Sequence, residues 1–139
     1  KINLKIKVIV SNEAQISIGN DSFSSLSDFK VKFESLREGE IISYKVFVKS
    51  AGDYNLKIYS ENMSMLANEN QKINTIIPYK IFLNESEIQF LNKNVVEVAI
   101  EKTSSDELTE HQFKLVLGNP SHAFKGAYSD KISLRAISN

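Results

Sequence analysis

Two histidines are the residues of this sequence best suited to general-base or metal-ligand chemistry near neutral pH. His111 and His122 stand eleven residues apart, and Glu107 precedes His111 by one helical turn. No second histidine accompanies that pair, so the spacing gives little support to a zinc or iron site. We expect both histidines to be surface loop residues, and we expect no metal site.

Nucleophilic catalysis has no better support in the sequence. Cysteine is absent, and no serine stands in a Gly-x-Ser-x-Gly elbow. Neighbouring carboxylates occur at Glu85 and Glu87 and at Asp106 and Glu107, but a chain with 24% charged residues offers such pairs by chance. The 5 glycines are scattered singly, so no phosphate-binding loop is present. We therefore expect no catalytic residues, no cofactor and no enzymatic activity.

The charge balance narrows the choice of partners. The 139 residues carry 17 basic and 17 acidic side chains, which gives a net charge of zero. A balanced chain lacks the basic footprint of a nucleic-acid-binding protein, so nucleic acid is not an expected partner. A single domain is the default at this length. The absence of cysteine excludes a disulfide framework and leaves the compartment open.

Hydrophobic residues alternate with polar ones along most of the chain, which predicts β-strands. The N-terminal segment is the clearest case, because one of its faces is entirely apolar: Ile2, Leu4, Ile6, Val8 and Val10. The same period recurs in six later segments, at 29–33, 42–48, 54–58, 96–100, 113–117 and 132–136. Turn residues separate these segments at the spacing of an antiparallel sandwich. The sequence therefore predicts an all-β protein.

A few local signals depart from this alternation. Ser104 and Glu107 have the spacing of a capping box, which predicts one turn of helix. Pro78 lies inside the strand-like segment 73–83 and cannot donate a ladder hydrogen bond, so it marks an edge, a bulge or a strand that switches sheets. Three aromatic residues could face outward, although core packing is the favoured role for them: Phe47, Tyr59 and Tyr79.

The C-terminal residues Gly126 to Ser138 form a Gly-x-Tyr-x-Asp turn followed by an alternating strand. This stretch resembles the closing strand of bacterial chaperone–usher pilins and of the related spore-coat-U-like (archaic) domains. Other short stretches occur in the order that this family shows, at Leu36–Glu40, Asp53–Leu56, Ser60–Asn62 and Ile77–Ile81. Because the chain lacks cysteine, it is similar to the class 5 (α-type) colonisation-factor pilins, and the choice between the two branches stays open.

The resemblance implies an immunoglobulin-like Greek-key β-sandwich that is incomplete and is completed by a donor strand from the next subunit. Residues 1–12 are then the donor-strand segment and residues 13–139 the pilin sandwich domain. The donor side chains are Ile2, Leu4, Ile6, Val8 and Val10. The acceptor groove is expected beside the final strand, with Ile132, Leu134 and Ala136 on its floor and Phe29, Val31 and Phe33 next to them. The alternative is that residues 2–10 are the first strand of a self-contained sandwich.

The function that the resemblance implies is that of a structural subunit of an extracellular bacterial pilus, or fimbria. The subunit passes through the periplasm, polymerises by donor-strand exchange and supports cell adhesion. Its expected partners are copies of itself or other pilus subunits, a periplasmic chaperone and an outer-membrane usher, with a host-surface receptor as a further candidate. Two alternatives remain, the pilin-like domain of a tip adhesin and a free-standing carbohydrate-binding β-sandwich.

Overall fold

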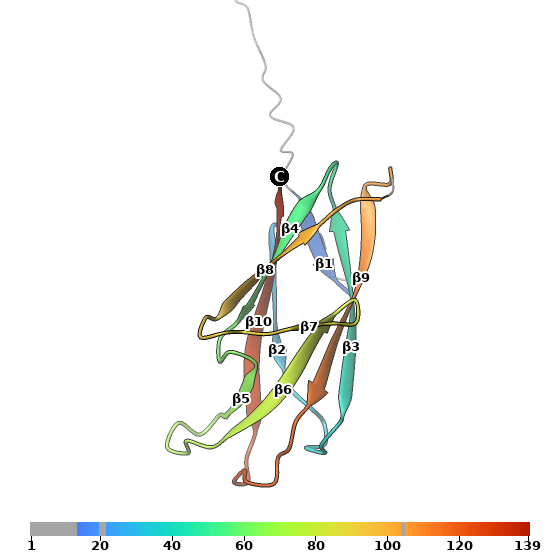
Figure 1. The fold of residues 1–139 in the computed structure, drawn as a ribbon. Helices are drawn as coiled ribbons and strands as arrows, with labels where there is room; N and C mark the ends of the chain where they lie inside the picture. The colour runs from blue at the N-terminus through green and yellow to red at the C-terminus, as the bar shows by residue number, and fades with distance from the viewer. Residues whose placement is uncertain (1–13, 20–21, 104) are drawn as a thin grey trace, which may run out of the picture.

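The described residues of the computed structural model, 14–19, 22–103 and 105–139, form ten β-strands (Figure 1). The predicted donor segment at residues 1–12 lies outside the described residues, as does its boundary with the sandwich domain. The strands are β1 (Gln15–Ile18), β2 (Leu26–Val31), β3 (Ile41–Lys49), β4 (Tyr54–Ser60), β5 (Met65–Asn68), β6 (Ile76–Leu83), β7 (Ser86–Ile88), β8 (Val95–Ile100), β9 (Leu108–Leu117) and β10 (Tyr128–Ser138).

All strand pairs are antiparallel and follow one path that folds into two facing layers (Figure 1). The β9 layer contains β1, β3, β9, β6 and β7 in that order, and the β10 layer contains β2, β10, β4 and β8. β5 joins the two layers, because it pairs with β6 on one side and with β10 on the other. The predicted all-β class is confirmed, and the arrangement is consistent with a β-sandwich.

The core lies between the layers and is made by the alternate residues that the sequence pattern selects. On β10 the side chains of Ile132, Leu134 and Ala136 are buried, and on β9 those of Phe113 and Leu115 face them from the other layer. Burial of each such side chain removes apolar surface from water, which is the main favourable term in folding. The period-two pattern therefore predicts the inward faces of the long strands correctly.

The turn of helix expected at Ser104–Glu107 is wrong for its described part, since none of the described residues is helical. Instead, the Glu107 carbonyl accepts a hydrogen bond from the Ser50 N–H at 2.9 Å. This bond continues the β3–β9 ladder by one step beyond the Lys49–Leu108 pair. Glu107 therefore belongs to the extended ladder and not to a helical turn.

Pro78 marks a strand that switches partners, which was one of its three expected roles. β6 pairs with β5 at Ile76–Pro78 and with β9 from Tyr79 onward. The Pro78 carbonyl accepts a hydrogen bond from the Gly118 N–H at 2.8 Å, just past the end of β9. Because proline has no N–H to donate, it is suited to the residue at which the ladder changes sides.

Gly118 should tolerate no side chain at this switch. A Cβ atom on Gly118 would stand 2.6 Å from the Pro78 carbonyl oxygen, a backbone atom that can move only with β6. We expect Gly118→Ala to lower the free energy of unfolding by about 1–3 kcal/mol in urea titrations. Gly52→Ala is the matched control, because a Cβ there meets nothing within 4 Å, and it should change stability by less than about 0.5 kcal/mol. Equal stability of the two variants would show that the switch is not tightly packed.

Candidate functional site

Five of the six residues predicted for the acceptor groove lie along β2 and β10, and Phe33 lies two residues past the end of β2. Ile132, Leu134 and Ala136 point inward from β10 and are at most 4% exposed. Phe29 stands opposite Ile132 in the β2–β10 ladder and is half-buried. Val31 and Phe33 belong to the core, with 0% and 7% of their surfaces exposed. Five of the six therefore have buried side chains, and Phe29 is the one that remains partly accessible.

The final strand β10 has a neighbour on each side along its middle. Residues 132–135 pair with β2 on one side and with β4 on the other. The place beside the final strand, where the groove is expected, is therefore occupied by β2 in this structure. A strand from another chain would take that place only by displacing β2 from β10; with β2 in position, it would pair with the outer edge of β2 instead.

One flank of the molecule carries two strand edges without a second strand partner among the described residues. β2 pairs with β10 alone, and residues 41–44 of β3 pair with β9 alone. We call these two edges and the gap between them the open flank. The rings of Phe29 and Tyr44 meet across it with centroids 4.6 Å apart, so its floor is aromatic. Leu26 and Ile41 on its rims are 49% and 56% exposed.

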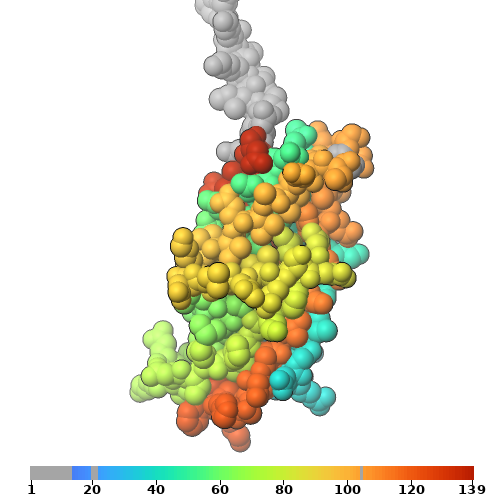
Figure 2. Space-filling view, viewed as in Figure 1, coloured from blue at the N-terminus to red at the C-terminus, as the bar shows by residue number. Residues whose placement is uncertain are grey.

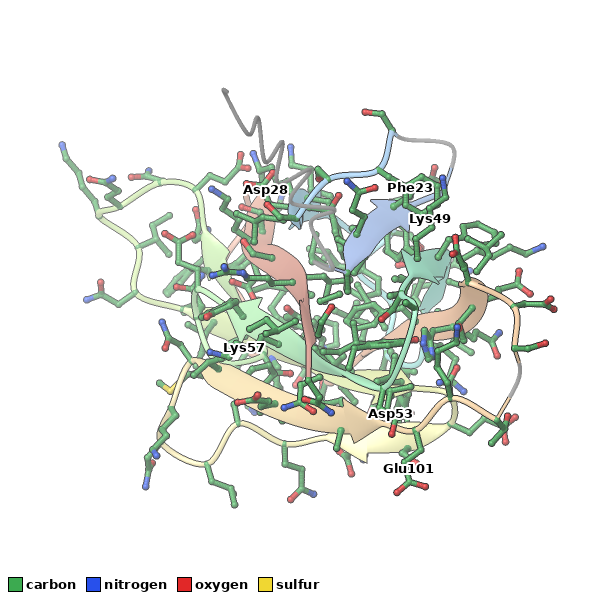
Figure 3. The ribbon with its side chains drawn as sticks, turned by 90° about the horizontal axis from the view of Figure 1, so that it is seen from above. Phe23, Asp28, Lys49, Asp53, Lys57 and Glu101 are labelled. Atoms are coloured by element: carbon green, nitrogen blue, oxygen red, sulfur yellow. The ribbon has the colours of Figure 1, made fainter. Side chains whose placement is uncertain are left out.

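The rest of this flank is closed where β1 lies. Ile16 of β1 bridges to Ser24, so that β1 reaches from β3 toward the start of β2. On the outside, the Lys49 ammonium lies 4.2 Å from the centroid of the Phe23 ring, and Figure 3 shows these two side chains next to each other. On the opposite flank β7 pairs with β6 alone and β8 with β4 alone, and the connection between β7 and β8 crosses the front of the molecule in Figure 2 and packs Phe90 against the core. The open flank is thus confined to β2 and the first half of β3.

The Gly-x-Tyr-x-Asp motif at the start of β10 builds a buried polar cluster. Asp130 is 3% exposed, and its carboxylate accepts hydrogen bonds from the Ser60 hydroxyl, the Tyr79 hydroxyl at 2.5 Å and the Asn62 N–H at 3.0 Å. These donors come from β4, β6 and the β4–β5 turn, so one side chain ties three segments to β10. We call this group of four residues the Asp130 latch. Hydrogen bonds of this kind are what allow a carboxylate to be buried.

Core packing, the favoured role for Tyr79, is confirmed, because the side chain is 3% exposed and does not face outward. Burial raises the pKa of its hydroxyl, and the negative charge of Asp130 raises that pKa further. The hydroxyl therefore stays protonated and remains a donor to Asp130. The other two aromatic residues of that group, Phe47 and Tyr59, are half-buried.

The expectation that His111 is a surface loop residue is also wrong. It lies on β9 and is 4% exposed, because its position continues the inward face of Phe113 and Leu115. His122 is exposed in the loop before β10, as expected. Among the described residues there is no group of histidine, cysteine, aspartate and glutamate side chains that could hold a metal ion.

The hydrogen bonds of His111 fix its tautomer. Asn84 Oδ1 accepts the Gln112 N–H at 2.8 Å, so Asn84 Nδ2 is the donor that faces His111 Nδ1 at 2.7 Å. Nδ1 is then the acceptor, and Nε2 carries the proton that it donates to the Tyr54 hydroxyl at 2.5 Å. A second proton on Nδ1 would point at the Asn84 amide, which is itself a donor. The site therefore favours neutral histidine, and burial lowers the pKa of the ring.

This environment predicts a loss of stability in mild acid. Because the pKa of His111 is lowered in the folded chain, the unfolded chain binds the extra proton first as the pH falls below about 6.5. Stability should be level above that pH and fall below it, by at most about 1.4 kcal/mol per pH unit from this one group. Urea titrations between pH 7.5 and 5.5 measure the slope. The slope should disappear in His111→Gln and persist in His122→Gln; the same slope in both variants would exclude His111 as its source.

The Asp130 latch and the His111 contacts organise the fold, whereas the open flank, like the outer edges of β7 and β8, presents strand edges that have no second strand partner among the described residues. No helix among the described residues is long and apolar enough to cross a membrane. No model of a known protein family matches this chain, and no curated protein matches it either.

Proposed function

We propose that this protein is a structural subunit of an extracellular bacterial pilus that polymerises by donor-strand exchange. The observation that carries the proposal is the open flank, where β2 and the first half of β3 present unpaired edges beside the aromatic floor of Phe29 and Tyr44. The alternating segment at residues 2–10 supplies a strand of matching period. The likeness of Gly126 to Ser138 to the closing strand of chaperone–usher pilins supports the same assignment.

The proposed exchange has a simple physical basis. Unpaired N–H and C=O groups at a sheet edge pair readily with a strand from another chain, which supplies a ladder and side chains for the pockets beneath it. Burial of the five apolar donor side chains of residues 2–10 contributes on the order of 10 kcal/mol before the entropy of ordering is subtracted. Donation from each subunit to the next is a heterologous contact that does not close, so it extends into a filament.

The proposal includes an immunoglobulin-like Greek-key topology that a donor strand completes. It also includes the partners that such a subunit needs before assembly. A chain with an open edge over apolar side chains is prone to aggregate, so a periplasmic chaperone would cover that edge until an outer-membrane usher passes the subunit to the growing fibre. Copies of the same chain, or other pilus subunits, then replace the chaperone.

Negative-stain microscopy of the native material, together with an unboiled denaturing gel, tests this function. We expect thin filaments and a ladder of detergent-resistant oligomers that collapses to the monomer after boiling. A monomer that is stable without a partner and forms neither filaments nor a ladder would contradict the proposal and favour the self-contained sandwich.

A further inference from the structure

The outer face of the β10 layer contains a hollow that the proposed polymerisation does not use. Its volume is about 550 Å³, and it is lined by Ser25, Leu26, Tyr59, Ser133 and Arg135. These residues come from the segment before β2 and from β2, β4 and β10. The hollow opens to solvent on the outer face of the layer, away from the core, whereas the open flank is the edge of β2; Leu26 is common to both.

The strand register explains why the hollow forms. Ile132, Leu134 and Ala136 of β10 face the core, so Ser133 and Arg135 face outward. Ser133, with its small side chain, stands in the middle between Tyr59 of β4 and Asp28 of β2. The larger side chains of Tyr59 and Leu26 form its walls, and Arg135 also lines it.

Arg135 lacks an acceptor on either neighbouring strand. Its cross-strand partners are Leu26 on β2 and Lys57 on β4, and none of the ion pairs among the described residues includes Arg135. Like charges directly opposite each other in a ladder repel; Lys57 also stands opposite Glu97 of β8, whereas Arg135 has no acidic residue directly opposite it on either side. A bound anion would relieve this repulsion.

The nearest carboxylates on this face have other partners. Asp28 lies 3.5 Å from the Lys131 ammonium, and Glu97 accepts a hydrogen bond from the Asn55 amide at 2.8 Å. Lys57, which is labelled in Figure 3, lies on the outward side of β4 between Leu56 and Ile58, whose side chains are buried. Neither Arg135 nor Lys57 takes part in an ion pair among the described residues, and Arg135 is the one of the two that lines the hollow.

We propose that this hollow binds a carboxylate-bearing sugar. A guanidinium group presents parallel N–H donors that match the two oxygens of a carboxylate. The Tyr59 ring and the Leu26 side chain offer apolar surface to the C–H face of a sugar ring, and the hydroxyls of Ser25 and Ser133 suit its hydroxyl groups. An inorganic anion would use the arginine and leave the apolar walls without a contact, which favours the saccharide.

This site goes beyond the proposed function, because binding here needs neither the open flank nor a donor strand. A chain that fails to polymerise should therefore still bind the sugar, and a chain that fails to bind the sugar should still polymerise. The two proposals can fail separately.

Titration of the full chain with 3′-sialyllactose and with lactose, at a fixed ionic strength of about 0.15 M, tests the site. The two probes differ by the carboxylate-bearing residue, and amide chemical shifts report both affinity and location. We expect 3′-sialyllactose to bind at least about tenfold more tightly than lactose and to shift the signals of β2, β4 and β10 around Ser133. Equal affinities, or no binding of either probe, would overturn the proposal.

Arg135→Gln should weaken 3′-sialyllactose binding at least about tenfold. Arg37→Gln is the matched control, because Arg37 is exposed in the β2–β3 loop and should leave binding unchanged. Ser133→Leu, which fills the hollow and keeps the charge, should also abolish binding, and unchanged urea midpoints confirm that each variant is folded. Loss of binding in Arg37→Gln as well, or equal displacement of the sugar by inorganic phosphate or by an acidic peptide, would show a non-specific anion surface and contradict the sugar site.

Discussion

Replacement of Asp130 by alanine is expected to lower the free energy of unfolding by roughly 3 kcal/mol. The variant leaves the buried hydroxyls of Ser60 and Tyr79 without their acceptor and removes the bond that holds the Asn62 N–H. Ser60 also accepts the Ser64 N–H at 2.7 Å, so the loss extends into the β4–β5 turn. Urea unfolding of the purified chain measures the change.

Two comparison variants separate the latch from a general effect of charge. Asp28→Ala removes an exposed carboxylate, 3.5 Å from Lys131, and should change stability by less than about 0.5 kcal/mol. Asp130→Asn keeps the shape and one acceptor oxygen but turns an amide donor toward two hydroxyl donors, so it should fall between the wild type and the alanine variant. If Asp130→Ala were as stable as Asp28→Ala, the hydrogen bonds from Ser60, Tyr79 and Asn62 would contribute nothing to the stability of the fold.

Ile6→Asp should abolish most of the assembly, because it places a carboxylate at the centre of the proposed donor strand. Burial of an unpaired charge costs several kcal/mol, and each 1.4 kcal/mol changes an equilibrium constant tenfold. We expect the detergent-resistant ladder on unboiled gels to fall at least about tenfold. Densitometry of dimers and larger species at equal protein concentration measures the effect.

Lys5→Asp is the matched control for this substitution. It introduces the same side chain one residue earlier, on the polar face of the alternating segment. A strand that inserts with Ile6 inward leaves residue 5 outward, so this variant should keep the ladder. Equal loss in both variants would indicate an effect of net charge, and equal persistence would contradict the donor role of Ile6.

The sequence predicts the long strands because alternation over five or more residues determines which side chains face inward. It also predicts that strand pairing is interrupted or changes partner at Pro78, because a residue without an N–H cannot donate a ladder hydrogen bond. The short strands β1, β5 and β7 contain four, four and three residues, which is too few for a period to be recognised. β1 is held by pairing with β3 and β5 by pairing with β6 and with the distant β10, whereas β7 forms a hairpin with the preceding strand β6.

The polar residues of the interior are harder to predict from the sequence. His111 occupies an inward position of β9, but its polar side chain is stable there because Tyr54 and Asn84, 57 and 27 residues away, satisfy both ring nitrogens. Asp130 likewise depends on Ser60 and Tyr79 from other strands. The Gly-x-Tyr-x-Asp spacing singles out Asp130 in the sequence. Its partners cannot be predicted in the same way, because they come from strands that are brought together only by the fold.

For the predicted acceptor residues, the sequence pattern likewise predicts which side chains face inward but not which strands are neighbours. Period two places Ile132 and Phe29 on inward faces, and the structure brings them side by side. The pattern does not determine which strand lies next to which, so it could not predict that β2 pairs with β10 and that the free edge belongs to β2.

The most direct test of the proposed exchange uses a chain that begins at Ser11 together with a synthetic peptide of residues 1–10. We expect this chain to form no ladder on its own. We also expect the peptide to bind one-to-one and to raise the thermal unfolding midpoint by several degrees, while a peptide carrying Ile6→Asp does not. A ladder from the shortened chain, or an unfolding midpoint that the wild-type peptide leaves unchanged, would contradict donor-strand exchange.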